Sequence, residues 1–187
     1  MDSGGDRLII GLVGTLGAGK STVAKYLETL GFEPFRLSNM IREKFKKRTW
    51  KRNTLQDSGN KLREKYGTSY LAKKTLEKIE EKGIKKAVVD GIRNLGEFEY
   101  FASKSKFYLV SVNAPAKIRY LRLKARKSEA DPKTWCQFQE IEKIDLDEKL
   151  YFGQQTKKVM QKADFSIKNT DLTKLYQKVD TILKTLP

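Results

Sequence analysis

The stretch that decides the fold reads Gly14-Thr15-Leu16-Gly17-Ala18-Gly19-Lys20-Ser21-Thr22. It fits the pattern G-x-x-x-x-G-K-[ST], in which glycines let successive backbone N–H groups turn toward a phosphate without interference from a Cβ atom. In this pattern the lysine reaches the β- and γ-phosphates, and the hydroxyl after it ligates Mg²⁺. We therefore expect all nine residues to bind ATP, with Lys20 as a catalytic residue and Ser21 as a metal ligand.

The flanking segments place this loop between a strand and a helix. Residues 7–13 (RLIIGLV) form a short apolar run rich in β-branched residues, which is typical of a buried strand. Residues 21–30 carry apolar side chains at helical spacing and are followed by a glycine that closes the helix. A helix that begins at the loop points the positive end of its dipole toward the bound anion. The dinucleotide-binding pattern G-x-G-x-x-G does not fit this spacing.

The rest of the chain alternates between strand and helix patterns. Short apolar runs predict further strands over residues 32–37, 87–90, 107–112 and 165–167. Helical spacing predicts helices over residues 39–47, 55–66, 69–82, 95–103, 115–127, 131–145, 155–162 and 172–183. Such alternation predicts a parallel sheet with helices on both faces. We expect a single P-loop domain over residues 1–187, of three-layer α/β/α class, with a mainly parallel five-stranded sheet.

Composition excludes several kinds of chemistry. The 187 residues include no histidine, which removes Ser-His-Asp and Cys-His catalytic groups. Cys136 is the single cysteine, so the chain has neither an internal disulfide nor a multi-cysteine zinc site. This usage favours a reducing, cytoplasmic location. Charged residues interrupt every apolar stretch before it reaches the length of a bilayer, so we expect no membrane partner.

The excess of positive charge indicates a polyanionic partner. The chain has 39 Lys and Arg against 23 Asp and Glu, a formal net charge of +16. Basic clusters lie at residues 42–52 and 117–127. We favour binding of a small phosphorylated ligand by the arginines of these clusters, because guanidinium groups fit phosphate oxygens. Nucleic acid is a less favoured partner. If it were the partner, the affinity of the protein for oligonucleotides would fall steeply with salt concentration. No feature of the sequence indicates an oligomeric state.

A second motif, at residues 88–93, resembles a segment of a known protein family. Val88-Val89-Asp90-Gly91-Ile92-Arg93 resembles the strand of adenylate kinases that ends in D-G-F-P-R, although the arginine comes one residue early and the proline is missing. Nearly the whole chain is similar to the small P-loop kinases, namely nucleoside monophosphate kinases and dephospho-CoA kinases. The resemblance implies that Asp90 acts near Mg²⁺ and that Arg93 binds the acceptor's phosphate. An aspartate at the end of a strand beside the P-loop is also where a Walker-B-type carboxylate belongs.

Two further segments resemble the acceptor-binding region and the lid of these kinases. Residues 37–42 (LSNMIR) are similar to G-D-x-L-R, whose arginine binds the acceptor's phosphate. This implies acceptor-binding roles for Ser38 and Arg42, to which Arg63 adds a second guanidinium, within a helical insertion at about 38–83. Arg119, Arg122 and Arg126 have the spacing i, i+3 and i+7, which places them on one helical face. An all-basic stripe repels itself, and a bound polyphosphate would offset this repulsion. The resemblance implies a small arginine-bearing lid at about 117–135, with Arg122 and Arg126 as catalytic residues.

The C-terminal third resembles dephospho-CoA kinases. Residues 163–170 (ADFSIKNT) look like their last strand and loop, whose backbone borders the adenine. This likeness implies that Asn169 and Thr170 lie near the base of ATP. Gly153-Gln154-Gln155 is also similar to the corresponding segment of that family.

The nature of the acceptor depends on the turn after the second strand. A phosphate acceptor needs positioning and charge neutralisation, whereas a sugar hydroxyl benefits from a carboxylate base. Dephospho-CoA kinases carry D-x-D at this turn, but residues 32–48 contain only Glu33 and Glu43 as acids. We therefore expect ATP-dependent phosphorylation of a nucleoside or deoxynucleoside monophosphate. Dephospho-CoA kinase is the alternative, followed by an NTPase without an acceptor and by a nucleic-acid-binding regulatory protein.

Overall fold

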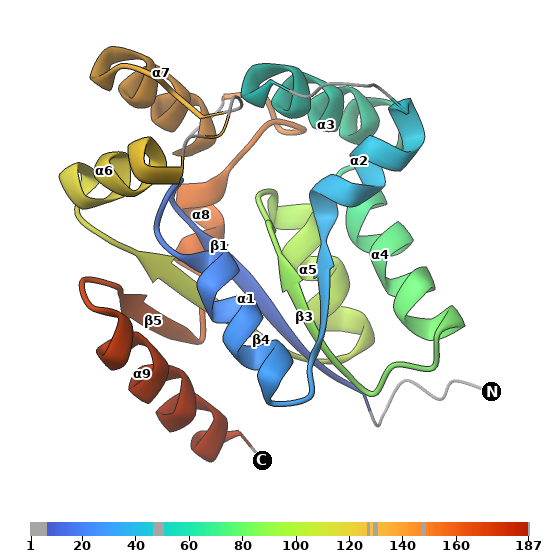
Figure 1. Cartoon of the computed structure of the whole chain (residues 1–187). Helices are drawn as coiled ribbons and strands as arrows, with labels where there is room; N and C mark the ends of the chain where they lie inside the picture. The colour runs from blue at the N-terminus through green and yellow to red at the C-terminus, as the bar shows by residue number, and fades with distance from the viewer. Residues whose placement is uncertain (1–6, 47–50, 127, 129–130, 147–148, 187) are drawn as a thin grey trace.

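The fold is built on a five-stranded sheet whose strands all run parallel (Figure 1). The computed structural model describes residues 7–46, 51–126, 128, 131–146 and 149–186. In these residues the strands are β1 (Leu8–Gly14), β2 (Glu33–Arg36), β3 (Lys86–Asp90), β4 (Lys106–Asn113) and β5 (Phe165–Lys168), in the order β2-β3-β1-β4-β5. The expected P-loop α/β class is confirmed, and the sheet is parallel throughout this part of the chain.

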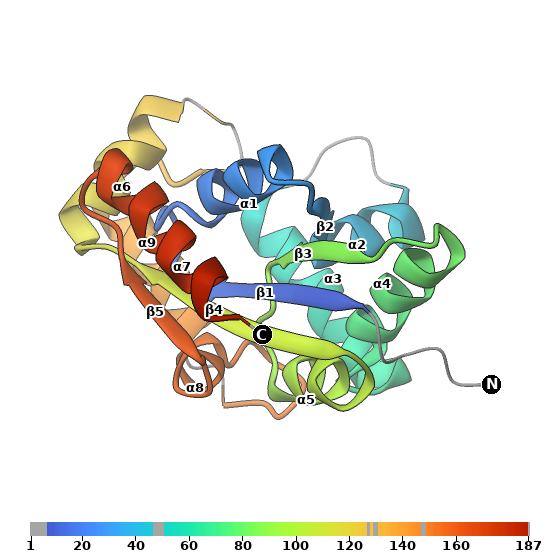
Figure 2. The same ribbon diagram turned by 90° about the horizontal axis from the view of Figure 1, so that it is seen from below.

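Helices cover both faces of the sheet because the side chains of each strand alternate between them. In β1, Ile10 and Leu12 face the layer formed by α1 (Lys20–Thr29) and α9 (Leu172–Thr185). Ile9 and Val13 face the opposite layer, which contains α4 (Tyr70–Glu81), α5 (Leu95–Lys104) and α8 (Thr156–Met160). Figure 2 shows the two helical layers on either side of the strands. Two apolar cores therefore hold the central strand rigidly beneath the P-loop.

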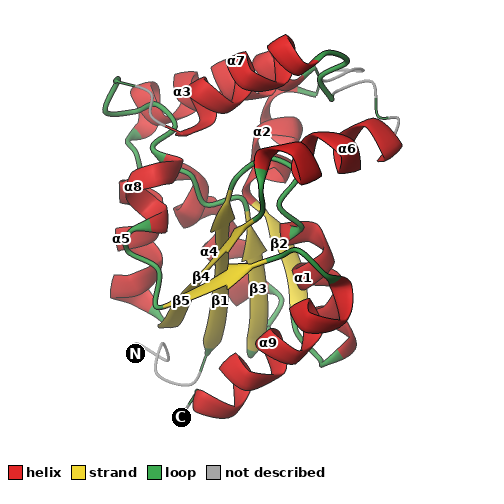
Figure 3. Ribbon diagram, turned by 90° about the vertical axis from the view of Figure 1, so that its left-hand side faces the viewer, coloured by secondary structure: helices red, strands yellow, loops and turns green. Residues whose placement is uncertain are grey.

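Four helices lie beyond the carboxyl ends of the strands (Figure 3). They are α2 (Leu37–Phe45), α3 (Arg52–Tyr66), α6 (Ala116–Arg126) and α7 (Trp135–Leu146). Leu16 of the P-loop packs with Leu123 of α6 and Phe138 of α7 in a small separate core. This core places α6 and α7 beside the loop, while α2 and α3 lie across from them. Ligands of open α/β sheets bind at this end of the strands.

Local backbone geometry accounts for the helix boundaries that differ from expectation. The helix expected at residues 39–47 begins at Leu37, because the backbone is extended only as far as Arg36, and it ends before Lys46, whose φ is +47°. The helix expected at 155–162 is a short one, over Thr156–Met160. Lys47 and Arg48 of the first basic cluster, Lys127 of the second, and residues 129–130 of the expected lid lie outside the described residues. In the described part of the chain, every helix falls short of the length and apolar character needed to cross a membrane.

Candidate functional site

The P-loop connects β1 directly to α1, and its glycines are required by its geometry. Gly17 and Gly19 have φ values of +76° and +103°, which other residues rarely adopt. A Cβ atom on Gly14 would collide with the carbonyl oxygen of Val112, and one on Gly19 would collide with the amide nitrogen of Asn169. The first turn of α1 therefore begins at a loop that only glycine can form at these positions.

Lys20 lies back over the loop that precedes it. Its Nζ donates hydrogen bonds to the carbonyl oxygens of Gly14, at 2.7 Å, and Thr15, at 3.0 Å. The hydroxyl of Thr15 donates in turn to Oδ1 of Asn113, at 2.8 Å, which fastens the loop to the end of β4. Gly14 and Thr15 thus support the loop, whereas residues 16–22 line the cavity described below.

Asn169, just after β5, links the P-loop to helix α6. Its buried side chain donates a hydrogen bond from Nδ2 to the carbonyl oxygen of Ala18, at 2.7 Å. Arg122 of α6 donates to the backbone oxygen and to Oδ1 of Asn169, at 3.3 and 3.4 Å. Asn169 lines the cavity, while Thr170 is exposed and is not among the residues that line it.

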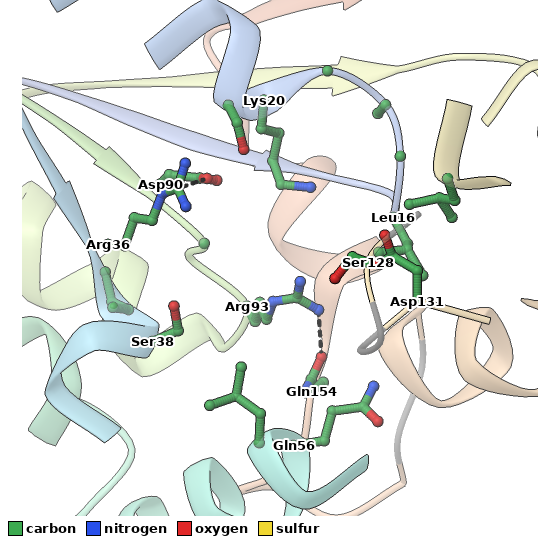
Figure 4. Close-up of a pocket in the computed structure, with 18 of the residues that line it drawn as sticks. Leu16, Lys20, Arg36, Ser38, Gln56, Asp90, Arg93, Ser128, Asp131 and Gln154 are labelled. Atoms are coloured by element: carbon green, nitrogen blue, oxygen red, sulfur yellow. Dashed lines mark hydrogen bonds and ion pairs between the residues drawn. The ribbon is translucent and has the colours of Figure 1, made fainter. Parts of the chain in front are cut away.

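A cavity of about 810 Å³ lies at the carboxyl ends of β1, β2 and β3. The P-loop and α6 form one side of it, and α2, α3 and the segment after β3 form the other (Figure 4). Its charged lining consists of two carboxylates, Asp90 and Asp131, and eight basic side chains: Lys20, Arg36, Arg42, Lys51, Arg63, Arg93, Arg122 and Arg126. Such a lining suits a ligand or ligands with several negative charges.

Asp90 ends β3 and is aligned with Leu12 of β1 and Arg36 of β2. Its Oδ2 lies 3.8 Å from Nε of Arg36, and its Oδ1 is buried and has no hydrogen-bond partner in the described residues. An orphaned carboxylate oxygen beside a phosphate-binding loop is the kind of group that a cation or its bound water satisfies. Ser21 lines the same cavity. The described residues contain no cluster of three acidic, cysteine or histidine ligands. Ser21 and Asp90 nevertheless fit Mg²⁺, because this ion binds through one or two protein groups together with phosphate oxygens and water.

The four residues expected at the acceptor, Ser38, Arg42, Arg63 and Arg93, all line the cavity. Arg42 donates to Oγ of Ser38, at 2.9 Å, one turn earlier in α2. Partial burial and the nearby charge of Arg36 lower the pKa of Arg42 below its ordinary value. No carboxylate in the described residues lies within ion-pair distance of Arg42, so its charge is available to an anionic ligand.

Arg63 and Arg93 differ from Arg42, because carboxylates inside the protein neutralise them. Nε of Arg63 donates to Glu97 at 2.8 Å, and both side chains are buried. Glu97 also accepts bonds from the backbone N–H groups of Arg93 and Asn94, where it completes the capping box of α5. Arg93 pairs with Asp145 of α7 at 2.8 Å and donates to Gln154 at 2.7 Å. Burial disfavours the charge of Arg93, but Asp145, together with the charges of Asp90 and Glu97, outweighs this cost and raises the pKa of Arg93.

The arginines of α6 do not all reach the cavity. Arg122 and Arg126 line the cavity, and Arg126 forms a bidentate ion pair with Asp131. Arg119 is buried instead, where it donates to the carbonyl oxygens of Ala114 and Leu16 and pairs with Glu142 of α7. The repulsion expected along this basic stripe is therefore partly offset by acidic groups of the chain itself.

Sequence reasoning missed several residues that form the site. Arg36 and Gln56 line the cavity, as does Asp131, and the carboxylates of Glu97, Asp145 and Glu142 hold its arginines. Arg36 had a usable signal, since it ends a strand as Asp90 does, and parallel strands end at one edge. Gln154 and Gln155 hold Arg93 in place: Gln154 accepts a hydrogen bond from the side chain of Arg93, and the backbone N–H of Gln155 donates to its carbonyl oxygen.

The loop, the parallel sheet and the cationic cavity together define a P-loop protein with a kinase-like fold. A family model described as an AAA domain matches residues 10–171. A UPF0200 protein from Staphylothermus marinus is 35% identical over 185 residues, which cover 96% of this chain and 94% of the relative. The chain therefore belongs to this AAA domain family and to the UPF0200 proteins.

Solved structures with the same fold include two at 18% sequence identity. TT1252 from Thermus thermophilus has a TM-score of 0.62 over 97% of this chain and 98% of its own. Shikimate kinase from Acinetobacter baumannii, in complex with shikimate, has a TM-score of 0.59 over 95% of this chain and 93% of its own. At this identity the likeness concerns the fold, so the acceptor must be argued from the site itself.

Proposed function

We propose that this protein is an ATP-dependent kinase that transfers the γ-phosphate of ATP to the phosphate of a nucleoside or deoxynucleoside monophosphate. The observation that carries the proposal is one cavity lined by the P-loop on one side and by arginines on the other. Eight basic groups and two carboxylates face this space, which matches a donor and an acceptor that are both phosphorylated.

The proposed donor site consists of the P-loop and the residues that hold it. The backbone amides of residues 16–22 bind the phosphates, supported by Gly14 and Thr15, and Lys20 leaves the carbonyl oxygens of these two residues to neutralise the β- and γ-phosphates. Asn169 and Thr170 border the base. Ser21 and Asp90 would hold Mg²⁺, which when bound neutralises charge on the β- and γ-phosphate oxygens.

The proposed acceptor region is the helical segment at about 38–83, and the proposed lid lies at about 117–135, both within one domain. Ser38, Arg42, Arg63 and Arg93 line this acceptor region. Arg122 and Arg126 approach the transferring group, where they stabilise charge in the transition state and help to exclude water. The reaction takes place in the cytoplasm, as the cysteine usage of the chain indicates.

The end of β2 favours a phosphate acceptor over a hydroxyl. Arg36 and Ser38 stand at this point, where a hydroxyl-directed kinase such as dephospho-CoA kinase would need carboxylates. The two acidic residues nearby do not supply such a carboxylate to the cavity. Glu43 pairs with Lys78, and Glu33 is exposed to solvent at the start of β2. An acceptor phosphate is already an anion, so positioning by cations is the main requirement.

One observation favours a second candidate, phosphorylation of a hydroxyl such as the 3′-hydroxyl of dephospho-CoA. Oδ1 of Asp90 is buried without a partner in the described residues, so it is able to accept the proton of a substrate hydroxyl.

A single assay separates these functions. ADP production is measured with Mg²⁺ and ATP against all ribo- and deoxyribonucleoside monophosphates, dephospho-CoA and no acceptor, with Lys20→Ala as the inactive control. We expect turnover with one or more monophosphates and little without an acceptor. Turnover with dephospho-CoA alone would establish the second candidate. Equal turnover without any acceptor would indicate an NTPase, and no turnover with any acceptor would contradict the proposal.

A further inference from the structure

Arg36 occupies a position in the cavity that no motif of the sequence indicated. It is the last residue of the edge strand β2, directly beside Asp90 in the register of β2 and β3. Its side chain is 49% exposed, and its Nε lies 3.8 Å from Oδ2 of Asp90 (Figure 4). At this distance the two groups attract each other without a hydrogen bond. Its N–H groups, which make no hydrogen bond within the described residues, are therefore available to a ligand.

A second guanidinium lies close to the first. Arg42 of α2 lines the same cavity, and the charge of Arg36 contributes to the lowered pKa of Arg42. The hydrogen-bond partners of Arg42 in the described chain are the neutral oxygens of Ser38 and Asn39. Two neighbouring cations repel each other, and an anion bound to both would remove this repulsion.

The remaining arginines on this side of the cavity are already committed to carboxylates. Arg63 is buried against Glu97, and Arg93 is held by Asp145 and Gln154. A ligand phosphate would have to compete with buried charged partners at both places, which is costly. Arg36 and Arg42 are therefore the two arginines on this side whose guanidinium groups make no hydrogen bond to a carboxylate in the described residues.

We propose that Arg36 is a specificity-determining residue that, together with Arg42, binds the phosphate of a monophosphate ester, while its ion pair holds Asp90 beside the donor. Arg63 and Arg93 act chiefly as positioning residues, which fix α3 and the segment after β3. The inference rests on the proposed function for one point, namely that the ligand at this pair is the acceptor. It implies that neutral alcohols of similar size are poor acceptors.

Binding of inorganic phosphate tests the anion site without any assumption about the acceptor. The donor site is first filled with Mg²⁺ and the ATP analogue AMP-PNP, and phosphate is then titrated by calorimetry. We expect Arg36→Gln to weaken phosphate binding about tenfold and Arg36→Lys to weaken it by roughly threefold, because lysine keeps the charge but loses the fork of donors. The matched control is Lys104→Gln, at the end of α5, near the amino end of β4 and far from the cavity. This control should bind as the wild type does. Unchanged affinity in Arg36→Gln, or no phosphate binding by the wild type, would overturn the inference.

Steady-state kinetics then separate the inference from the proposed function. With a monophosphate acceptor, Arg36→Gln should raise the acceptor KM about tenfold and leave the KM for ATP within about twofold. If the wild type phosphorylates no monophosphate but binds phosphate through Arg36, the proposed function fails and the anion site stands. If a monophosphate is phosphorylated with the same KM by wild type and Arg36→Gln, the function stands and the role of Arg36 is wrong.

Discussion

The two sides of the cavity are constructed in different ways. The donor side is one continuous stretch of nine residues, which runs from the end of β1 into the first turn of α1. It supplies backbone amides and one lysine. The acceptor side gathers arginines from β2, α2, α3 and the segment after β3, and carboxylates of α5 and α7 hold two of them. A phosphate site made of backbone amides depends on the conformation of one loop and on the few groups that brace it, such as Asn113 and Asn169. In a site made of arginines, the charge available to a ligand depends on which arginines are paired with carboxylates of the protein.

The largest effect should come from the lysine of the donor side. Lys20→Ala should lower kcat about a thousandfold, because the charge at the β- and γ-phosphates is lost at the transition state. The melting temperature should change by less than about 2 °C, since Lys20 is only partly buried and bonds to loop carbonyls. Turnover and calorimetric melting of the same preparation check both points. Near-normal turnover would remove Lys20 from the donor site.

On the acceptor side, the largest effect should be on stability. Glu97→Ala leaves the buried guanidinium of Arg63 without its partner and removes two backbone caps, which should cost about 3–5 kcal/mol of unfolding free energy. Urea unfolding measures this loss. Glu97→Gln is the matched control, because it keeps an acceptor oxygen for the backbone N–H groups. Equal stability of wild type and Glu97→Ala would show that the pair does not hold α3 to α5.

Arg42 should affect catalysis more than stability. Arg42→Ala should raise the acceptor KM roughly thirtyfold, because a charge-assisted bond to phosphate is lost, and leave the KM for ATP nearly unchanged. Its folded-state partners are neutral oxygens of α2, so the melting temperature should stay within a few degrees of the wild type. An unchanged acceptor KM in this variant would place the acceptor elsewhere in the cavity.

Asn169 offers a smaller test on the donor side. Asn169→Ala removes the bond to the carbonyl oxygen of Ala18 and the contact between Oδ1 and Arg122, so the P-loop loses a support. We expect the KM for ATP to rise about fivefold, with the acceptor KM unchanged. Titration of each substrate at saturating levels of the other shows the difference. A rise confined to the acceptor KM would contradict the division of the cavity into two sides.

The smallest effect is expected where an exposed arginine pairs with an acid. Arg126 is 54% exposed in its ion pair with Asp131, and pairs of this kind contribute about 1 kcal/mol or less to stability. Asp131→Asn should therefore change stability little and raise kcat about twofold, because Arg126 no longer has to leave a carboxylate to reach the transferring phosphate. A marked fall in kcat would mean that the pair itself positions the lid.

Sequence reasoning succeeded where structure depends on neighbours in the chain. The P-loop, the strand that leads into it and the parallel sheet follow from spacing and apolar patterns, and the structure confirms the fold. The register that sets Arg36 beside Asp90 depends on pairing between segments 54 residues apart, which no local pattern encodes. Helix α2 also begins earlier than expected, at Leu37, because the extended backbone of β2 ends at Arg36.

Residues expected at the acceptor line the cavity, but the carboxylates that pair with them do not follow from the sequence. Arg42, Arg63 and Arg93 all reach the cavity, as expected, yet the sequence does not reveal that Glu97 and Asp145 neutralise two of them. Similarly, helical spacing alone does not distinguish Arg119, which is buried against Glu142, from Arg122, which lines the cavity. Such pairings arise from tertiary packing, and they decide which positive charges are left for a ligand.

The bond between Asn169 and Ala18 joins residues 151 positions apart, which affects the time course of synthesis. Ribosomes add about 5–20 residues each second, so the amide arrives roughly 8–30 seconds after the carbonyl that it supports. Throughout that interval the nascent chain carries every residue of the glycine-rich turn but lacks the brace beneath it. Tight capture of nucleotide should therefore begin only after Asn169 has been synthesised and has reached the loop.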